Sequence, residues 1–427
     1  MSAARGARPQ RGAGGPGRAA PPRRDAPARR PQRATTTRSV ARRPEATAVE
    51  LTFLPGLRDV LAAEVAEVLP DARDLHDVPG RDDAVALRLP GPLAPVVRLR
   101  TAVAAWVVVH LDVPRPKSIA SPEHLQRVVD AVYASLRVAG SSTFRFEAAG
   151  SDSAVFARLA ELLHEATGLR HDAAHGDLVV RVRRGVRGAG GTRPGAGRGA
   201  VDRARRTGGD EADPGWDVLV RVGPRPLSAR TWRVVDFPGA ANATIAAAMT
   251  RLAGTRDDDR VLNLMCGSGT LLAERLLAAP AAASLGVDRA QPALDAARAN
   301  LEAAGLLGRA SRTALVRADA TDAAAVRDAV DAHLAVDDRP PAADLVLADP
   351  PWGTLHGSHA ASPALHAGLL RGAHAVTAPG ARLVVLTHEV KVMERVVREA
   401  ADLWAPVTTT RVFAKGHHPR VHVLRRV

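Results

Sequence analysis

The chain of 427 residues is long enough for two or three domains, and its 46% hydrophobic content is that of an ordinary globular protein. Its net charge of +14 favours a polyanionic partner but specifies no sequence. The single cysteine, Cys266, excludes an intramolecular disulfide and a cysteine-rich metal cluster, and it agrees with a reducing cytoplasm.

The basic charge is concentrated in two segments. Residues 1–46 contain 12 arginines against Asp25 and Glu45, a net charge of +10, and residues 181–206 contain nine arginines against Asp202, a net charge of +8. Because proline and glycine are frequent in both segments, we expect residues 1–46 to form a disordered basic tail and residues 185–215 to form a flexible insertion. No apolar run approaches the roughly 20 residues of a membrane span, so we expect no membrane partner.

The first half of the chain predicts short strands alternating with helices. AVELTF predicts a strand, and after a Pro-Gly break comes an amphipathic helix whose apolar residues are Leu57, Val60, Leu61, Val65 and Val68. DAVALRLPG and AAWVVVHLDV predict further strands with a helical stretch between them, which completes a small α+β unit. A second unit is expected from Ser121, with helices in SPEHLQRVVDAVYASL and SDSAVFARLAELLHEATG on either side of the strand STFRFEAAG. DLVVRVRR and WDVLVRVG predict a hairpin that encloses the insertion.

From Asp236 onward, longer apolar strands alternate with helices. The predicted strands lie in RVLNLMCGSGT, SLGVDRA, TALVRADATD, DLVLADPP and ARLVVLTHE, with helices LLAERLLAA and QPALDAARANLEAAG between the first three. Continuous apolar strands separated by helices are typical of a parallel sheet that is covered on both faces. The second half therefore predicts a doubly wound α/β domain, whose ligands would bind at the carboxyl ends of its strands.

Four of these strand ends are polar in a consistent way. The first runs from Asn263 to Thr270 and opens a helix through Gly267 and Gly269, where a ligand can approach the backbone closely. The second ends at Asp288, 19 residues beyond Gly269, and the third ends at Asp319. The fourth ends in Asp349-Pro350-Pro351-Trp352. A carboxylate at the position of Asp288 can accept bonds from two ribose hydroxyls.

Each strand end has a plainer structural alternative. A Gly-Ser-Gly turn often only connects a strand to a helix, a strand-ending Asp often caps a helix, and an Asp-Pro-Pro corner can be a simple strand exit. Four such ends in order have few plain explanations. Dinucleotide binding is a competitor, but CGSGT is not G-x-G-x-x-G. Cys266 is interpreted as a packing residue, since the sequence supplies no matched base for a thiolate nucleophile, and His417 and His418 as turn residues rather than metal ligands.

These motifs resemble a known family. The second half resembles the class I S-adenosylmethionine-dependent methyltransferases, and MCGSGT with DPPW narrows the resemblance to enzymes that methylate exocyclic amino groups of nucleobases. The first half is similar to the ferredoxin-like plus THUMP module through FLPGLRDVLAAEV, the helix–strand–helix of residues 122–168 and the junction RTWRVVDFPGAANATIAAAM. Together, residues 47–427 resemble the THUMP-domain tRNA guanine-N2 methyltransferases. The chain departs from the family in Asn263, where Asp is usual, in Trp352, where Tyr is commoner, and in the arginine-rich insertion.

The resemblance implies a fold and a set of partners. The expected fold is an α+β ferredoxin-like/THUMP region, residues 47–232, followed by a Rossmann-like methyltransferase domain, residues 233–427. The implied cofactor is S-adenosyl-L-methionine, and the implied partner is RNA, most simply tRNA, in the cytoplasm. No metal is implied, and a need for a protein partner stays open.

The resemblance also implies roles for individual residues. Asp288 would bind the ribose hydroxyls of the cofactor and Asp319 its adenine amino group. The methionine portion would lie against the loop that contains Asn263, Cys266, Gly267 and Gly269, where Asn in place of Asp lowers the negative charge. Asn242 and Thr244 would contact the methionine end, and the alternative is that they only cap the helix that begins near Ile245.

The Asp-Pro-Pro-Trp corner would act on the target amine. An exocyclic amine is a poor nucleophile because its lone pair is delocalised into the ring. If Asp349 and the backbone carbonyl of Pro350 accept hydrogen bonds from its two protons, the lone pair is aimed at the methyl donor and the developing charge is stabilised. Trp352 would stack on the extruded base. The competing functions are an rRNA or DNA amino-methyltransferase and a catalytically silent RNA-binding adaptor of the same fold.

Overall fold

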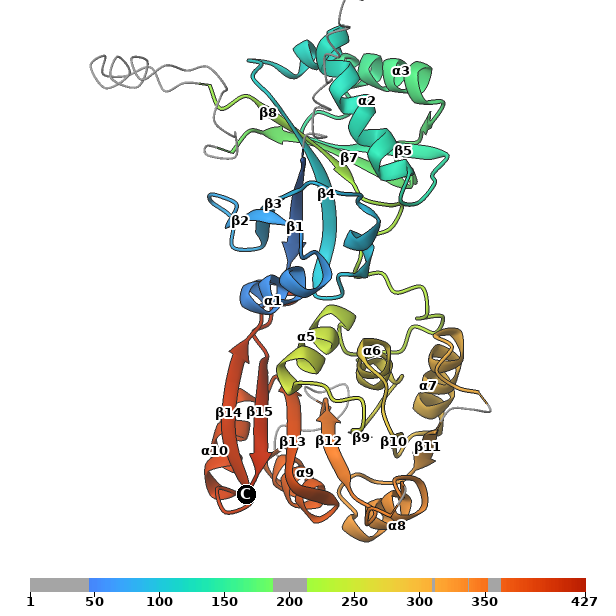
Figure 1. The fold of residues 1–427 in the computed structure, drawn as a ribbon, viewed down its shortest axis with the longest axis vertical. Helices are drawn as coiled ribbons and strands as arrows, with labels where there is room; N and C mark the ends of the chain where they lie inside the picture. The colour runs from blue at the N-terminus through green and yellow to red at the C-terminus, as the bar shows by residue number, and fades with distance from the viewer. Residues whose placement is uncertain (1–45, 187–212, 309–311, 337, 352–361) are drawn as a thin grey trace, which may run out of the picture. The chain divides into compact units, whose positions relative to one another are not determined.

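The computed structural model describes residues 46–186, 213–308, 312–336, 338–351 and 362–427 (Figure 1). The expected basic tail lies outside the described residues except for Ala46, as does most of the expected insertion, residues 187–212. In the described part of the chain, no helix has the length and apolar character needed to cross a membrane.

The first half of the chain forms one mixed sheet in the order β2-β3-β1-β4-β8-β7-β5-β6. Its strands are β1 (Thr47–Phe53), β2 (Arg73–Asp77), β3 (Ala84–Leu89), β4 (Ala102–Leu111), β5 (Thr143–Glu147), β6 (Arg170–His171), β7 (Leu178–Arg184) and β8 (Trp216–Arg221). The sequence predicts two small α+β units here, and the structure joins them. The ten-residue β4 makes the join, because it pairs with β1 along one edge and with β8 along the other.

The helices of this half are α1 (Arg58–Val68), α2 (Pro122–Leu136) and α3 (Ala154–Thr167), with short 3-10 turns η1 (Ala94–Arg98) and η2 (Pro116–Ala120). Alternate residues of the strands, such as Val49 and Leu51 of β1 and Val107 and Val109 of β4, pack into the same apolar core as the buried residues of the helices. Strands β7 and β8 pair antiparallel, which confirms the predicted hairpin around the insertion.

The second half forms a seven-stranded sheet in the order β11-β10-β9-β12-β13-β15-β14. Its strands are β9 (Arg260–Leu264), β10 (Ala283–Asp288), β11 (Thr313–Arg317), β12 (Ala343–Ala348), β13 (Thr377–Thr387), β14 (Trp404–Arg411) and β15 (Arg420–Arg426). The first five are parallel to one another, as expected from their apolar runs, whereas β15 is antiparallel to both β13 and β14.

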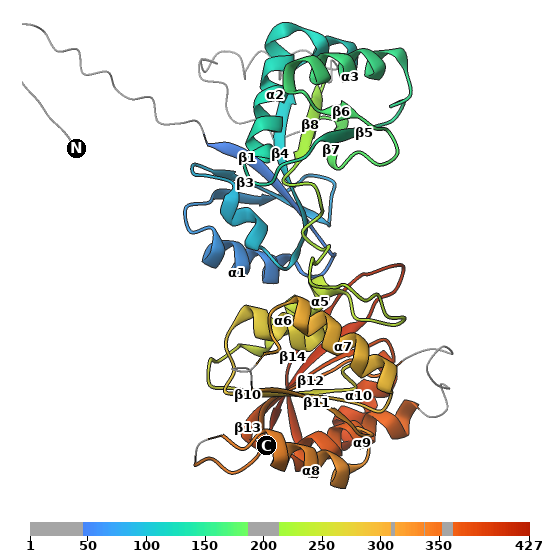
Figure 2. The same ribbon diagram turned by 90° about the vertical axis from the view of Figure 1, so that its right-hand side faces the viewer.

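Helices cover both faces of this sheet (Figure 2). They are α5 (Ala243–Ala253), α6 (Thr270–Ala278), α7 (Gln291–Ala303), α8 (Ala323–His333), α9 (Ser362–Ala375) and α10 (Val390–Glu399). One apolar core lies between the strands and α8, α9 and α10, and a second lies on the face of α5 and α6. The doubly wound α/β fold expected for the second half is thus confirmed. The strand order reverses between β9 and β12, which makes the carboxyl ends of these two strands the topological switch point.

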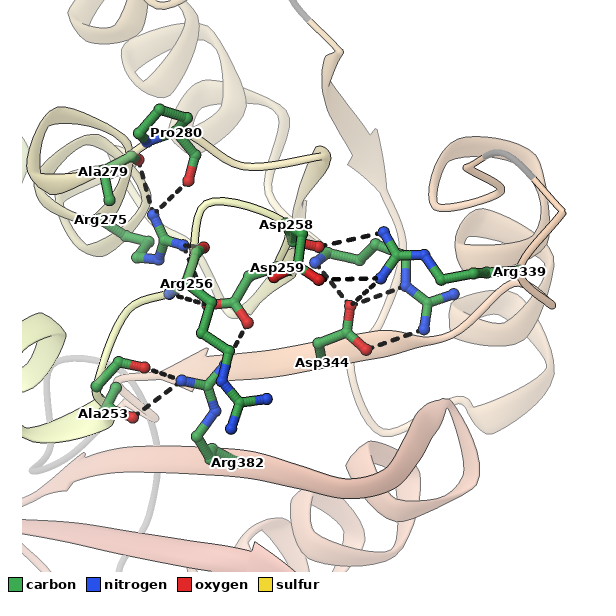
Figure 3. Close-up of polar contacts among 12 residues, drawn as sticks. Ala253, Arg256, Asp258, Asp259, Arg275, Ala279, Pro280, Arg339, Asp344 and Arg382 are labelled. Atoms are coloured by element: carbon green, nitrogen blue, oxygen red, sulfur yellow. Dashed lines mark hydrogen bonds and ion pairs between the residues drawn. The ribbon is translucent and has the colours of Figure 1, made fainter.

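The opposite edge of the sheet, where β9, β12 and β13 begin, contains a buried ionic cluster (Figure 3). Asp259 is 1% exposed and accepts hydrogen bonds from the guanidinium groups of Arg275 and Arg382. Nearby, Arg260 donates two hydrogen bonds to Asp344, both of 2.9 Å. The charges satisfy one another within the protein, so this edge serves to join α6, β9, β12 and β13.

Candidate functional site

The polar ends of four parallel strands meet at one edge of the sheet. Strands β9, β10, β11 and β12 are neighbours and parallel, so their carboxyl ends lie on the same side. The sequence predicts most of its candidate residues at these four ends, and it predicts Asn242 and Thr244 in the segment that begins α5. The fold brings the described strand-end residues to a common edge. Trp352 lies outside the described residues, and its stacking role stays a prediction.

The loop after β9 forms a tight turn with a backbone conformation that residues other than glycine rarely adopt. Met265, Gly267 and Gly269 all have positive φ angles, of 53°, 53° and 76°. A Cβ atom on Gly269 would lie 3.1 Å from the Cβ of Ala297, whereas a Cβ on Gly267 would meet no atom within 4 Å. Gly269 is therefore required by helix packing, and Gly267 faces open space, as a residue next to a ligand would.

Asp288 fixes this loop to the end of β10. Its Oδ2 accepts the N–H of Gly267 at 2.9 Å, and its Oδ1 accepts the N–H of Ala290 at 2.9 Å. A carboxylate has about four lone-pair sites, so two remain for a ligand. The partial exposure of Asp288 leaves them accessible, and its position fits the predicted contact with ribose hydroxyls.

Asp319 is exposed and organises the turn after β11. Its Oδ1 accepts both the N–H and the hydroxyl of Thr321, at 2.8 and 2.6 Å. The hydroxyl bond is the main cause that lowers the pKa of Asp319, so the group is ionised at neutral pH. Helix α8 is capped instead by Asp322, which accepts from Ala324 and Ala325. The plain alternative, in which Asp319 is a helix cap, does not describe this residue.

Asn242 and Thr244 behave differently from each other. Asn242 caps α5, because its side-chain oxygen accepts the N–H groups of Thr244 and Ile245 at 2.9 and 3.4 Å. The predicted contact of Asn242 with the methionine end of the cofactor stays a prediction. Thr244 is completely buried, and its hydroxyl has no hydrogen-bond partner in the described part of the chain. Among the described residues, nothing satisfies this polar group.

Asn263 sits in the centre of the sheet at the switch point. The residue is completely buried, and its Nδ2 donates to the carbonyls of Leu347 and Leu264 at 3.0 and 3.3 Å. These bonds follow from the register of β9 and β12, in which Asn263 lies opposite Leu347. The remaining oxygen, Oδ1, is buried and lacks a partner among the described residues.

Cys266 lies in the glycine loop, but its side chain packs into the protein interior. Its side chain is buried, and the nearest polar contact of Sγ is the carbonyl of Gly267 at 3.8 Å. Burial, with a smaller contribution from the charge of Asp288, raises the pKa of the thiol far above neutrality. The protonated, packed thiol agrees with the interpretation of Cys266 as a packing residue and is unsuited to nucleophilic attack.

Asp349 is the chemically most distinctive residue of the edge. The residue as a whole is partly exposed, but its Oδ1 is buried without a partner in the described structure. Burial raises the pKa of Asp349 to about 7. Pro350, which follows, is buried and has no N–H to donate. A carboxylate oxygen thus stands unpaired at the end of β12, next to a carbonyl held by two prolines.

Four buried polar atoms without partners in the described structure belong to this edge of the fold. They are the hydroxyl oxygens of Thr244 and Ser268 and the side-chain oxygens Asn263 Oδ1 and Asp349 Oδ1. Strand alternation places Asn263 and Asp349 on the side of the sheet that α5 covers, since Val261 and Leu347, two residues before each, pack into the core on that face. An unpartnered buried polar group costs free energy, so a set of them at a switch point indicates a site for a polar ligand.

Sequence reasoning missed the side chains that support this site. Asn300 of α7 accepts the N–H groups of Val234 and Val235, both at 3.0 Å, and donates to the carbonyl of Ser268 at 3.1 Å. Arg233 donates to the carbonyl of Ala241 and to the hydroxyl of Thr270, both at 2.8 Å. These bonds tie the segment before α5 to the glycine loop, and no local pattern reports them because the partners are far apart in sequence.

A second missed contact lies at the carboxyl end of β13. His366 of α9 is completely buried, and its two ring nitrogens contact the carbonyl of Ser362 at 2.8 Å and the hydroxyl of Thr387 at 3.0 Å. Burial lowers the pKa of His366, so the neutral ring donates through Nδ1 and accepts through Nε2.

Among the described residues, no group of three or more His, Cys, Asp and Glu side chains is arranged to hold a metal ion.

Comparisons with known proteins relate the chain to methyltransferases. Residues 230–420 match the family model described as UPF0020, RMKL-like, methyltransferase domain. The chain is 28% identical over 400 residues to the tRNA (guanine(6)-N2)-methyltransferase of Thermus thermophilus, an alignment that covers 89% of this chain and 99% of the relative.

Solved structures show the same architecture. The crystal structure of TrmN from Thermus thermophilus has a TM-score of 0.62 and 25% identity, covering 89% of this chain and 100% of that one. A structure described as a predicted N6-adenine-specific DNA methylase from Listeria monocytogenes has a TM-score of 0.53 and 14% identity over 89% of this chain and 96% of that one, a likeness of fold alone. The polar strand ends described above lie within residues 230–420, the part of the chain that matches the RMKL-like methyltransferase domain.

Proposed function

We propose that this protein transfers a methyl group from S-adenosyl-L-methionine to the exocyclic 2-amino group of a guanine in tRNA. The observation that supports the proposal most directly is the buried carboxylate oxygen of Asp349, which has no partner among the described residues. Asp349 directly follows β12 at the switch point. The same activity is the one printed for the relative from Thermus thermophilus that spans 89% of this chain.

The protein's part in the reaction is to bind and orient the amine. The 2-amino group carries two protons, and Asp349 Oδ1 and the carbonyl of Pro350 supply two acceptors on adjacent residues. Hydrogen bonds to both would direct the nitrogen lone pair away from the ring plane. As the N–CH3 bond forms, positive charge develops on nitrogen, and the carboxylate stabilises it before one proton leaves. Because the acceptors are held by a strand end and two prolines, little reorganisation is needed.

The described residues fit the cofactor. Asp288 and Asp319 would hold its ribose and adenine, and Gly267 would let it approach the backbone of the loop. At the methionine end, the hydroxyls of Thr244 and Ser268 would donate or accept hydrogen bonds, and Asn263 Oδ1 would accept one. When bound, the sulfonium of the cofactor supplies an electrophilic methyl group. The roles of these residues, and that of Trp352 as a stacking platform, are part of the proposal.

The first half of the chain would hold the RNA. We infer that residues 47–232 are the ferredoxin-like plus THUMP region and that residues 233–427 are the methyltransferase domain, working together in the cytoplasm. The two sheets described above fall within these two ranges, and the RMKL-like match begins at residue 230.

The test is methyl transfer by the purified full-length chain from labelled cofactor to total tRNA, ribosomal RNA and DNA, followed by mapping of the product. We expect N2-methylguanosine at one tRNA position. A matched tRNA with inosine at that position lacks only the 2-amino group, so it should bind but receive no methyl. Label in adenosine, in ribosomal RNA only or in DNA would contradict the proposal, and cofactor binding without transfer to any of them would support the adaptor alternative.

A further inference from the structure

The turn that joins β14 to β15 lies at the edge of the sheet where Asp349 lies. Strand β13 ends at Thr387, which lies opposite Arg420 at the start of β15, and Arg420 lies opposite Arg411 at the end of β14. On the other side of β13, Ala348 of β12 pairs with Val385, so the chain after it reaches the level of Thr387 near Pro350. At about 4.8 Å per strand, Arg411 lies on the order of 15 Å from the predicted amine site.

This turn, residues 411–420, has the composition of a nucleic-acid contact. It contains Arg411, Lys415 and Arg420, and no Asp or Glu occurs anywhere between Trp404 and the C-terminal Val427. Glu389, two residues beyond Thr387, is the acidic residue nearest to the turn along β13. The local charge is therefore positive next to a site proposed to receive one nucleotide of a polyanion.

An exposed aromatic residue lies among these charges. Phe413 is 39% exposed, although its neighbour Val412 is completely buried. Its ring lies 4.9 Å from that of His418, and Arg411 donates a 3.3 Å hydrogen bond to Nδ1 of the same histidine. A flat ring with arginine beside it is the arrangement on which unpaired bases stack.

The backbone of the turn is closed by hydrogen bonds. Lys415 and Gly416 have positive φ angles of 50° and 80°, and Ala414 and His417 exchange two backbone hydrogen bonds of 3.0 Å. Two consecutive left-handed residues closed by such a pair are the type I′ turn that suits a β-hairpin. Gly or Asn adopts this conformation more readily than Lys. Lys415 nevertheless places its positive charge at the tip of the turn, at a cost in backbone strain.

We propose that residues 411–420, here called the basic turn, bind the RNA next to the methylated nucleotide. Phe413 stacks on a base that flanks the target, and Arg411 and Lys415 contact the adjoining phosphates. The inference rests on the proposed RNA substrate and adds a second contact surface, one located in the methyltransferase domain itself.

The test compares tRNA affinity across matched variants of the full-length protein, measured by fluorescence anisotropy at several salt concentrations. Phe413→Leu keeps the apolar volume but loses the flat face, and we expect it to weaken binding about 5- to 100-fold, whereas Phe413→Trp stays within about threefold of wild type. Arg411→Gln and Lys415→Asn should each lower the slope of log affinity against log salt by about 1. Asn is chosen at position 415 because it tolerates the positive φ angle.

The control is Arg398→Gln, which removes the same charge from an exposed position at the end of α10 away from this edge. It should leave affinity and salt slope unchanged. Wild-type affinity and slope in Phe413→Leu and Arg411→Gln, with unchanged melting temperature, would overturn the basic turn as an RNA contact. So would a change only in self-association. A wild-type protein that binds tRNA through this turn yet makes no N2-methylguanosine would instead refute the proposed function alone.

Discussion

Single residues at the switch point differ in how much of their hydrogen-bonding capacity the protein itself uses. Asp288 gives one oxygen to the glycine loop and one to the start of α7, and Asp319 gives one oxygen to Thr321. Asp349 instead keeps its buried Oδ1 unpaired among the residues that the structure describes. The first two carboxylates thus accept hydrogen bonds from their own loops, whereas under our proposal the third accepts a hydrogen bond from the substrate amine.

The pKa of Asp349 predicts the pH dependence of the reaction. Only the ionised carboxylate accepts a bond from the amine on either oxygen, and burial raises its pKa from 3.8 to about 7. We therefore expect kcat/KM, which reports the free enzyme, to rise about tenfold per pH unit below pH 7 and to level off above it. In Asp349→Asn, kcat/KM should no longer rise with pH, and its value above pH 7 should fall by at least about 100-fold. A flat wild-type profile between pH 5 and 8 would count against this role.

Asp288 should control affinity for the cofactor. Asp288→Ala removes two loop bonds and the remaining lone pairs, and we expect the Kd of S-adenosyl-L-methionine to rise by the equivalent of about 1–3 kcal/mol. The control is Asp322→Ala, which removes the cap of α8 and should lower stability by about 1 kcal/mol with no change in the Kd. Calorimetric titration checks both, and equal affinities for wild type and Asp288→Ala would show that the ribose lies elsewhere.

At the scale of elements, the loop between β9 and α6 contains two glycines with different surroundings. Gly267 and Gly269 both have positive φ, so alanine strains either by on the order of 1 kcal/mol. In Gly269→Ala the new methyl also meets Ala297 at 3.1 Å, whereas in Gly267→Ala it enters open space. We expect Gly269→Ala to lose more stability and Gly267→Ala to lose more cofactor affinity. Thermal melting and cofactor titration of the two variants check the pair, and the reverse order in either measurement would contradict it.

The sequence predicted the elements whose signals are local. Apolar runs that end in Asp or Gly identified β9, β10, β11 and β12, and hence the positions of Asp288, Asp319 and Asp349. The sequence did not predict strand β14, because its residues Ala405 to Thr409 are exposed, lack an apolar run and include Pro406, as an edge strand allows. The pairing of β4 with β8 was also not foreseen, since register between strands more than 100 residues apart depends on tertiary packing.

The supporting shell of the site was beyond prediction for the same reason. Asn300 reaches the glycine loop and the segment before α5 only after the sheet has formed, and its sequence surroundings are those of an ordinary helix. His366 likewise meets Thr387 across the interface of α9 and β13. The residues at the strand ends lie in short sequence motifs, which can be recognised locally. The hydrogen bonds that hold those motifs in place join segments far apart in sequence.

At the scale of the molecule, the methyltransferase sheet has two edges of opposite character. The site edge holds oxygens without partners in the described structure, and the far edge holds the paired charges of Asp259, Arg275 and Arg382 (Figure 3). Burial lowers the pKa of Arg382, which still remains protonated beside Asp259 at neutral pH. The paired charges thus lie at the edge away from the place where buried polar atoms lack partners among the described residues.

Removal of one partner from the far edge should destabilise the domain strongly. Asp259→Asn leaves two buried guanidinium groups without their counter-charge, and we expect a loss of about 3–5 kcal/mol in the free energy of unfolding. The neighbouring Asp258, whose side chain is 78% exposed, offers a control, since Asp258→Asn should change stability by less than about 0.5 kcal/mol. Urea denaturation of both variants is the measurement, and equal stabilities would show that the cluster contributes little.

The most direct test of the whole account is the nucleoside content of tRNA from a strain that lacks this protein. We expect one position to lose N2-methylguanosine, and the modification to return when the strain expresses the wild-type chain but not Asp349→Ala at the same protein level. Unchanged N2-methylguanosine in the deletion strain, or full restoration by Asp349→Ala, would contradict the account.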